Sequence, residues 1–151
     1  MRLIELTSAY AAVVNGGLWF PPITIHRLFD AETCISETTD HCRSRSTPVT
    51  TSRQAICPDK ALKMQSMLRA VVQKGTGQAA ARGGKEGGKT GTTNQGLNLL
   101  FIGYEPSNHR VLDIWLGNDD NSPTTGSSAL AAGLWGDIIR VAKSGGRQAK
   151  S

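Results

Sequence analysis

Apolar residues recur with a helical period near the start of the chain and again after residue 57. Over residues 3–14 they form one stripe, and Asn15-Gly16-Gly17 follows, where glycine can close a helix in the left-handed conformation. Pro58 suits the first position of a second helix, and Gly75 and Gly77 follow its last apolar residues. The pattern therefore predicts one helix over 3–14 and a second from Pro58 to these glycines.

The same periodicity predicts which side chains these helices bury. We expect Met64 and Met67 to fill the core, on one face with the other apolar residues of the second helix: Ala61, Leu62, Leu68, Val71 and Val72. A third helix, capped by Ser127 or Ser128, is expected near the end of the chain. Its predicted apolar face consists of Leu130, Leu134, Ile138 and Val141.

Alternation of apolar and polar residues predicts strands in the remaining segments. Residues 23–28 alternate before a turn at 30–33, which indicates a small hairpin, and residues 97–104 and 110–116 suit a second hairpin. The expected order is helix, hairpin, helix, three strands and helix. Segregated helices and strands of this kind are typical of an α+β fold with an antiparallel sheet.

Length and charge limit the choice of function. The 151 residues are enough for one domain, and 38% hydrophobic with 19% charged residues is a globular composition. The net charge of +5 is scattered, and the basic end of the chain has no interleaved aromatic residues, so we predict no nucleic-acid partner. We expect a domain over 1–143 and a flexible basic tail over 144–151. The chain shows no membrane anchor and no secretion signal.

The cysteines and histidines give weak signals. Cys34, Cys42 and Cys57 lack the short pairing of a zinc site, although His41 adjoins Cys42, and one disulfide among the three remains open. His26 falls on the polar face of the predicted strand, which favours an exposed residue over a catalytic one. We predict no metal and no cofactor.

The glycine-rich segment from Gly83 to Asn94 satisfies two functional motifs at once. From Gly83 to Thr90 it has the pattern of a phosphate-binding P-loop, and from Lys89 it has the sequence Lys-Thr-Gly-Thr. A P-loop follows a buried strand and opens a helix. Here a helix and a loop come before the motif, while two glycines and β-branched residues follow it. The nucleotide-binding interpretation is therefore the weaker one.

The Lys-Thr-Gly-Thr interpretation requires a strand that is accessible at an edge beside a cleft. Gly91 lets a peptide backbone approach, Lys89 supplies a positive charge, and Thr90 and Thr92 supply hydroxyls for a carboxylate. The backbone N–H of Thr92 can point at a developing oxyanion. The motif predicts a substrate-binding strand.

Several motifs in order resemble the C-terminal half of the transpeptidase domain of class A penicillin-binding proteins, the bifunctional peptidoglycan synthases. The matching segments lie at residues 6–17, 21–22, 67–77, 88–94, 101–104 and 115–121, and in the helix that carries Trp135. Lys-Thr-Gly is part of the signature of this family. The resemblance implies the corresponding part of the serine β-lactamase and penicillin-binding fold.

The chain departs from the family pattern in two places. It contains no Ser-x-x-Lys and no Ser-x-Asn, which in the family lie N-terminal to this region, so the chain resembles a piece that starts in mid-domain. Relatives commonly have an Asp-Trp pair before the Phe101-Ile-Gly-Tyr104 strand, where this chain has residues 95–100, Gln-Gly-Leu-Asn-Leu-Leu.

By this resemblance the parent enzyme is a D-alanyl-D-alanine transpeptidase that cross-links peptidoglycan stem peptides and is acylated by β-lactams, at the extracytoplasmic face of the bacterial membrane. Lys89 and Thr92 would be catalytic, and the substrate-binding residues would be Thr90, Gly91, Thr92 and Thr93. The missing N-terminal part of the domain is the implied partner, and without its nucleophile we expect this chain to be inactive. A non-catalytic peptide-binding module or a gene remnant remains the alternative.

Overall fold

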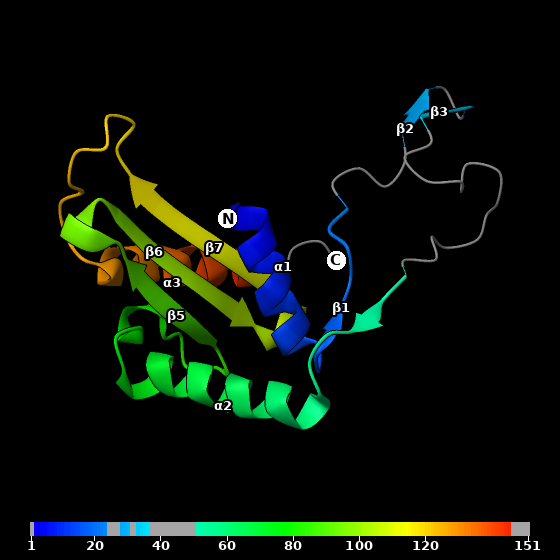
Figure 1. Ribbon diagram of the computed structural model, residues 1–151, viewed down its shortest axis with the longest axis horizontal. Helices are drawn as coiled ribbons and strands as arrows, with labels where there is room; N and C mark the ends of the chain where they lie inside the picture. The colour runs from blue at the N-terminus through cyan, green and yellow to red at the C-terminus, as the bar shows by residue number, and fades with distance from the viewer. Residues whose placement is uncertain (1, 24–27, 31–32, 37–50, 146–151) are drawn as a thin grey trace.

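The computed structural model describes residues 2–23, 28–30, 33–36 and 51–145, and a three-stranded antiparallel sheet forms its centre (Figure 1). The strands of this sheet, in spatial order, are β5 (Gly87–Thr92), β6 (Asn98–Glu105) and β7 (Arg110–Gly117). The helices are α1 (Leu3–Val14), α2 (Pro58–Lys74) and α3 (Ser128–Gly145). The predicted α+β class and the bounds of α1 are confirmed.

Shorter elements connect this framework. Two small antiparallel sheets pair β1 (Leu18–Trp19) with β4 (Arg53–Gln54), and β2 (Leu28–Asp30) with β3 (Thr33–Ser36). Three 3₁₀ helices complete the order: η1 (Gln78–Ala80), η2 (Asn94–Gly96) and η3 (Pro106–Asn108). Strands β2 and β3 pair on either side of the predicted early turn, but most of the predicted first strand, residues 24–27, lies outside the described residues. The pairing of β1 with β4 was not predicted. His26, His41, Cys42 and residues 146–151 of the predicted tail lie outside the described residues.

Helix α1 ends where the sequence predicts, at a pair of left-handed glycines. Gly16 and Gly17 have φ angles of +65° and +87°. A side chain at Gly17 would collide with the carbonyl oxygen of Ile56, so the turn also allows the chain to pass close to the segment before α2. The two backbones meet there because the N–H groups of Ala55 and Ile56 donate to the Gly17 carbonyl at 2.9 and 3.2 Å.

Helix α2 starts at Pro58 and is followed by Gly75, as predicted, but it buries a narrower stripe than expected. Its buried side chains are Ala61, Leu68 and Val72. Met64 and Met67 are 42% and 57% exposed, so the prediction that they fill the core is wrong. The helix packs against β5, α1 and η1, and Leu62 is exposed together with the two methionines.

Helix α3 packs behind the sheet, as Figure 1 shows, but with the face opposite to the predicted one. Its buried residues are Ala131, Ala132, Trp135 and Ile139, whereas Leu130, Leu134, Ile138 and Val141 are 39–65% exposed. The prediction is wrong because two faces of the helix are apolar, and the small alanines lie on the inner one. Small side chains let the helix come close enough to bury Trp135.

Trp135 is the centre of the core. Its ring is fully buried and meets Phe101 edge-on, with the ring centroids 5.5 Å apart, and its Nε1 donates to the Leu112 carbonyl at 3.1 Å. The ring lies against Gly103, where a Cβ atom would be 2.7 Å from it. Because Trp135 satisfies its own polar group, it can be buried without an unpaired donor. The core thus fixes β6 and β7 on α3, while α1 packs on the opposite face (Figure 1).

Candidate functional site

The Lys-Thr-Gly-Thr motif lies in β5, an edge strand of the central sheet. Lys89, Thr90 and Thr92 pair with Ile102, Phe101 and Leu99 of β6, and within the described residues the other edge of β5 has no strand partner. This is the edge position that a substrate-binding strand requires. The same geometry contradicts a P-loop, because Lys89 and Thr90 lie inside a strand and not at the start of a helix.

The glycines before Lys89 serve the packing of this strand. A Cβ atom at Gly87 would lie 2.5 Å from the Tyr104 ring, and one at Gly88 would lie 2.5 Å from Phe101. Larger residues at either position would push β5 away from β6. The glycine-rich composition that imitates a P-loop is therefore explained by close contact with two aromatic rings.

The side chains of the motif alternate between exposed and buried positions. Lys89 and Thr92 are exposed, whereas Thr90 is only 8% exposed. The Lys89 Nζ donates to the backbone oxygen of Thr90 at 2.7 Å and lies 3.4 Å from the Thr90 Oγ1. The charge of Lys89 and the hydroxyl of Thr90 are thus adjacent in this edge strand, against which α2 also packs.

Thr76 contacts the motif, which sequence reasoning did not predict. Its Oγ1 lies 2.6 Å from the Thr90 Oγ1, although the two residues are 14 positions apart. The segment between α2 and η1 carries Thr76 to β5. Its flanking residues, Gly75 and Gly77, were predicted as the end of a helix, and the sequence offered no sign that the residue between them reaches the motif.

The far end of the motif turns back toward β6. The Thr93 Oγ1 accepts hydrogen bonds from the backbone nitrogen of Asn98 at 2.9 Å and from its Nδ2 at 3.3 Å. Gln95 has a φ angle of +63°, and Trp115 Nε1 donates to the Asn98 Oδ1 at 2.9 Å. Where the chain departs from the family pattern, residues 95–97 therefore form a turn, and residues 98–100 begin β6, with Asn98 holding the turn to Thr93.

A buried carboxyl lies on the same face of the sheet as Lys89. Lys89, Ile102 and Asp113 are paired in register across the three strands, so their side chains emerge on one face, with the outer two backbones about 10 Å apart. Both Asp113 carboxylate oxygens are buried and, among the described residues, have no hydrogen-bond partner. Burial raises the pKa of Asp113; burial and then the charge of Asp113 raise the pKa of Tyr10 on α1.

A second group of buried charges fixes the end of α3. The Lys143 Nζ lies 3.0 Å from Glu86 Oε1 and 3.6 Å from Glu105 Oε1, and both glutamate side chains are 2% exposed. Burial alone would raise the pKa of each glutamate. Hydrogen bonds to backbone and side-chain donors, together with Lys143, outweigh burial and lower both pKa values. This cluster joins α3 to the start of β5 and the end of β6.

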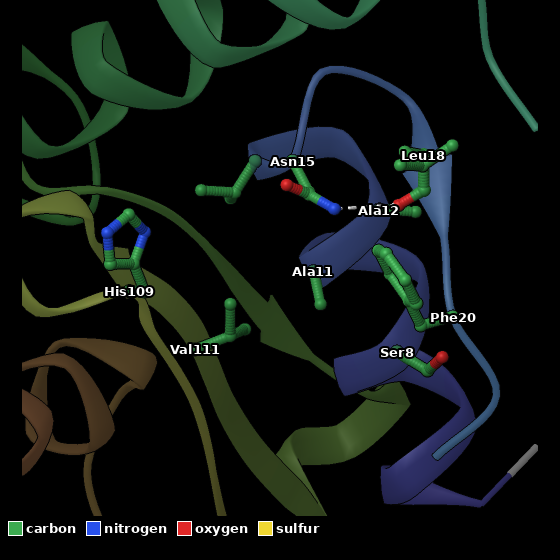
Figure 2. Close-up of a pocket in the computed structure, with 9 residues that line it drawn as sticks. Ser8, Ala11, Ala12, Asn15, Leu18, Phe20, His109 and Val111 are labelled. Carbon is green, nitrogen blue, oxygen red and sulfur yellow. Dashed lines mark hydrogen bonds between the residues drawn. The ribbon is translucent and has the colours of Figure 1, made fainter. Parts of the chain in front are cut away.

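A cavity of about 220 Å³ lies between α1 and the beginning of β7, separate from the motif (Figure 2). Its walls are largely apolar, and Figure 2 shows Ser8, Asn15 and His109 as polar groups around it. Ser8 Oγ accepts from Trp19 Nε1 at 2.9 Å, and Asn15 Nδ2 donates to the Leu18 carbonyl at 3.3 Å. No residue from Lys89 to Thr93 lines it, so this cavity does not extend the predicted site.

In the described part of the chain, no helix combines the length and the apolar character needed to cross a membrane.

Comparison with known proteins identifies one family over nearly the whole chain. Residues 2–140 match the model of the penicillin-binding protein transpeptidase domain. Penicillin-binding protein 1A of Clostridium botulinum is 38% identical over 96 residues, which are 62% of this chain and 11% of that protein. Penicillin-binding protein 1A of Neisseria gonorrhoeae is 27% identical over 148 residues, or 94% of this chain and 18% of that protein. The chain thus spans less than a fifth of these curated relatives.

Solved structures agree with this match. The D,D-transpeptidase domain of a peptidoglycan glycosyltransferase from Eggerthella lenta superposes with a TM-score of 0.64 at 26% identity, covering 90% of this chain and 31% of that one. Penicillin-binding protein 1A from Haemophilus influenzae gives a TM-score of 0.69 at 20% identity, covering 94% of this chain and 26% of that one, and supports the fold alone.

Proposed function

Because the chain belongs to the penicillin-binding protein transpeptidase domain family, we propose that β5 is the substrate-binding strand of a serine-type D-alanyl-D-alanine transpeptidase that cross-links peptidoglycan stem peptides. The observation that supports this proposal most is the position of Lys89-Thr-Gly-Thr92 in an edge strand with an exposed lysine. An extended peptide can add to such an edge through main-chain hydrogen bonds.

Each residue of the motif has a role in this proposal. Lys89 attracts the terminal carboxylate of the D-alanyl-D-alanine peptide, and the hydroxyls of Thr90 and Thr92 donate to it. Gly91 leaves room for the peptide, since a Cβ atom there would meet only Leu100, at 3.5 Å. The backbone N–H of Thr92 stabilises the developing oxyanion, a contribution worth about 2.7–4 kcal/mol for one such donor in other enzymes. Thr93 fixes the end of the substrate strand through Asn98.

The covalent step needs a group that this chain does not supply. In the proposed reaction a serine hydroxyl oxygen attacks the carbonyl carbon of the penultimate D-alanine, and the terminal D-alanine leaves with a proton on its amine. The resulting ester then passes its acyl group to an amine of a neighbouring stem peptide or to water. The sequence has no Ser-x-x-Lys, so the chain alone is proposed to bind substrate without being acylated.

The proposed partner is the serine-containing part of the same transpeptidase domain. Two surfaces of the described chain suit it: the edge of β7 that β6 does not pair, and the exposed apolar residues of α3. A strand of the partner that pairs with β7 would extend the sheet. An apolar surface of the partner over α3 would extend the core. By family we place this assembly at the extracytoplasmic face of the bacterial membrane, with stem peptides and β-lactams as ligands.

Binding of a carboxylate-terminated peptide tests the proposed site directly. The probe is an N-acetylated peptide that ends in D-alanyl-D-alanine, and its matched control is the same peptide with a C-terminal amide. We expect Lys89→Ala to weaken binding of the acid about tenfold, since a charge-assisted hydrogen bond is lost, and to leave the amide unaffected. Lys85→Ala removes another exposed charge four residues away and should change neither affinity.

Two results of this titration would count against the site. Equal binding of the acid and the amide would mean that the carboxylate is not recognised. An equal loss in Lys85→Ala and Lys89→Ala would mean that net charge, and not the strand, attracts the peptide. Binding that depends on Lys89 also agrees with a non-catalytic binding module. Acylation by a penicillin, measured after this chain is assembled with the serine-containing part, distinguishes such a module from the enzyme.

A further inference from the structure

A short hydrogen bond links the motif to a residue outside it. The hydroxyl oxygens of Thr76 and Thr90 are 2.6 Å apart, and Thr90 is 8% exposed whereas Thr76 is exposed. Among the hydrogen bonds of the described residues, Thr76 is the only hydroxyl that Thr90 contacts. A buried hydroxyl without a partner is destabilising, so this bond determines how the Thr90 side chain is oriented.

Either hydroxyl can donate in this bond, and the neighbouring lysine favours one of the two directions. An ammonium group can only donate, and the Lys89 Nζ is 3.4 Å from the Thr90 Oγ1. When Thr90 accepts from Lys89, its own proton remains available for the Thr76 Oγ1, 2.6 Å away. The order of donation in that arrangement is Lys89 to Thr90 to Thr76.

The backbone holds Thr76 in place independently of its hydroxyl. The N–H groups of Gly75 and Gly77 both donate to the Val71 carbonyl, at 3.0 and 3.1 Å. Gly77 lies so close to Phe101 that a Cβ atom there would be 3.1 Å from the ring. Removing the Thr76 hydroxyl should therefore leave the turn intact and change only the bond to Thr90.

We propose that Thr76 is a positioning residue of the substrate strand, acting through Thr90. Without substrate, Thr76 accepts the Thr90 proton and keeps this side chain in one rotamer. When a peptide carboxylate accepts that proton, the Thr76 hydroxyl rotates and donates to Thr90, so the Thr90 oxygen stays paired in both states. The substrate part of this inference rests on the proposed function, whereas the rotamer part does not.

Two substitutions separate the hydroxyl from the shape of the side chain. Thr76→Val keeps the branched shape and removes the hydroxyl, while Thr76→Ser keeps the hydroxyl. Thr7→Val is the matched control, because it removes a threonine hydroxyl that bonds only within α1, to the Leu3 carbonyl at 2.9 Å. The probe is again the acetylated D-alanyl-D-alanine peptide, with its amide as the control ligand.

We expect Thr76→Val to weaken binding of the acid about three- to tenfold, the range for one hydrogen bond, and Thr76→Ser and Thr7→Val to stay within about twofold of the wild type. Three-bond couplings to the Thr90 γ-methyl carbon, measured by NMR without peptide, report its rotamer. They should show one rotamer in the wild type and in Thr76→Ser, and averaging in Thr76→Val.

Each outcome decides a part of the inference. Unchanged affinity and unchanged couplings in Thr76→Val would overturn it, and so would a serine variant that behaves like valine. A wild-type chain that does not bind the acid overturns the proposed function and the substrate part together. In that case the couplings still decide whether Thr76 orients Thr90, so the two failures can be told apart.

Discussion

At the scale of single residues, Lys143 is the cation on which two buried carboxylates depend. Glu86 and Glu105 are almost fully buried and share this ammonium group at 3.0 and 3.6 Å. Lys143→Met keeps the length of the side chain and leaves both carboxylates without a charge partner. Since Lys143 is one-third exposed, water can replace part of the interaction, and we expect a loss of about 1–3 kcal/mol in the free energy of unfolding at pH 7.

The loss in Lys143→Met should depend on pH in a defined direction. The pKa of each glutamate is lowered in the folded chain from an ordinary value of 4.5. A lowered pKa stabilises the fold at neutral pH, and this stabilisation disappears as the pH falls below about 4.5. Denaturant titrations at pH 7 and pH 3 should therefore differ between wild type and variant mainly at pH 7. An equal difference at both values would contradict the ionic role of Lys143.

Asp113 presents the opposite case, a carboxyl group whose burial costs stability. Because its pKa is raised above the ordinary 3.8, the fold favours the protonated form and loses stability as the pH rises through the raised value. Asp113→Val suits a strand and removes two unpaired oxygens, so we expect about 1 kcal/mol of added stability at pH 7 and less at pH 3.5. Melting temperatures at both pH values test this. A variant that is less stable than the wild type at pH 7 would show that the Asp113 carboxylate makes a stabilising interaction.

At the scale of the elements, local signals in the sequence predicted where the helices begin and end. Pro58, Gly75 and the glycine pair after α1 act within one turn of the chain, so their effect does not depend on the rest of the fold. Ser127 also caps α3 as predicted, because its Oγ accepts from the backbone nitrogen of Ala129 at 3.3 Å. Strands β6 and β7 agree with prediction to within one residue at each end.

Features that depend on distant parts of the chain could not be predicted in the same way. The buried face of α3 was predicted wrongly because hydrophobicity favours leucine, whereas close packing on Phe101 selects alanine and Trp135. The two-residue pairing of β1 with β4 and the bond between Thr76 and Thr90 join segments that the sequence pattern does not connect. Lys89 and Thr92 were predicted as site residues from their motif, and their exposed positions in an edge strand support that prediction without testing it.

The exposed stripe of α3, formed by Leu130, Leu134, Ile138 and Val141, gives a prediction for this helix. Apolar residues in a row on one helix expose a continuous surface, which favours association. We expect the double variant Leu134→Glu and Ile138→Glu to bind less of a hydrophobic dye and to elute as a smaller species in gel filtration, with unchanged far-ultraviolet circular dichroism. Ala131→Glu places the same charge on the buried face and should unfold the chain. If the double variant unfolds like Ala131→Glu, the stripe belongs to the core.

At the scale of the whole molecule, the described chain has two open boundaries on one framework. One edge of the central sheet is β5, with the proposed substrate site, and the other is β7, which among the described residues pairs only with β6. The two edges are proposed to bind different partners. A peptide substrate binds at β5 and must dissociate after the reaction, whereas the partner at β7 is a folded part of the domain that stays bound. The exposed apolar surface of α3 would also be covered by such a folded part.

Acylation by a fluorescent penicillin tests this division of the site between two parts. The 151-residue chain alone should form no covalent adduct, since the proposed nucleophile is absent from its sequence. Mixed or co-expressed with the serine-containing part of a related transpeptidase domain, it should restore labelling of that serine, and Lys89→Ala in this chain should reduce the labelling rate at least tenfold, whereas Lys85→Ala should not. The α3 double variant, Leu134→Glu with Ile138→Glu, should reduce the amount of assembled pair. It should have a smaller effect on the rate at which each assembled pair is labelled. A serine adduct on this chain alone would refute the proposed division, because the chain would then supply a nucleophile of its own.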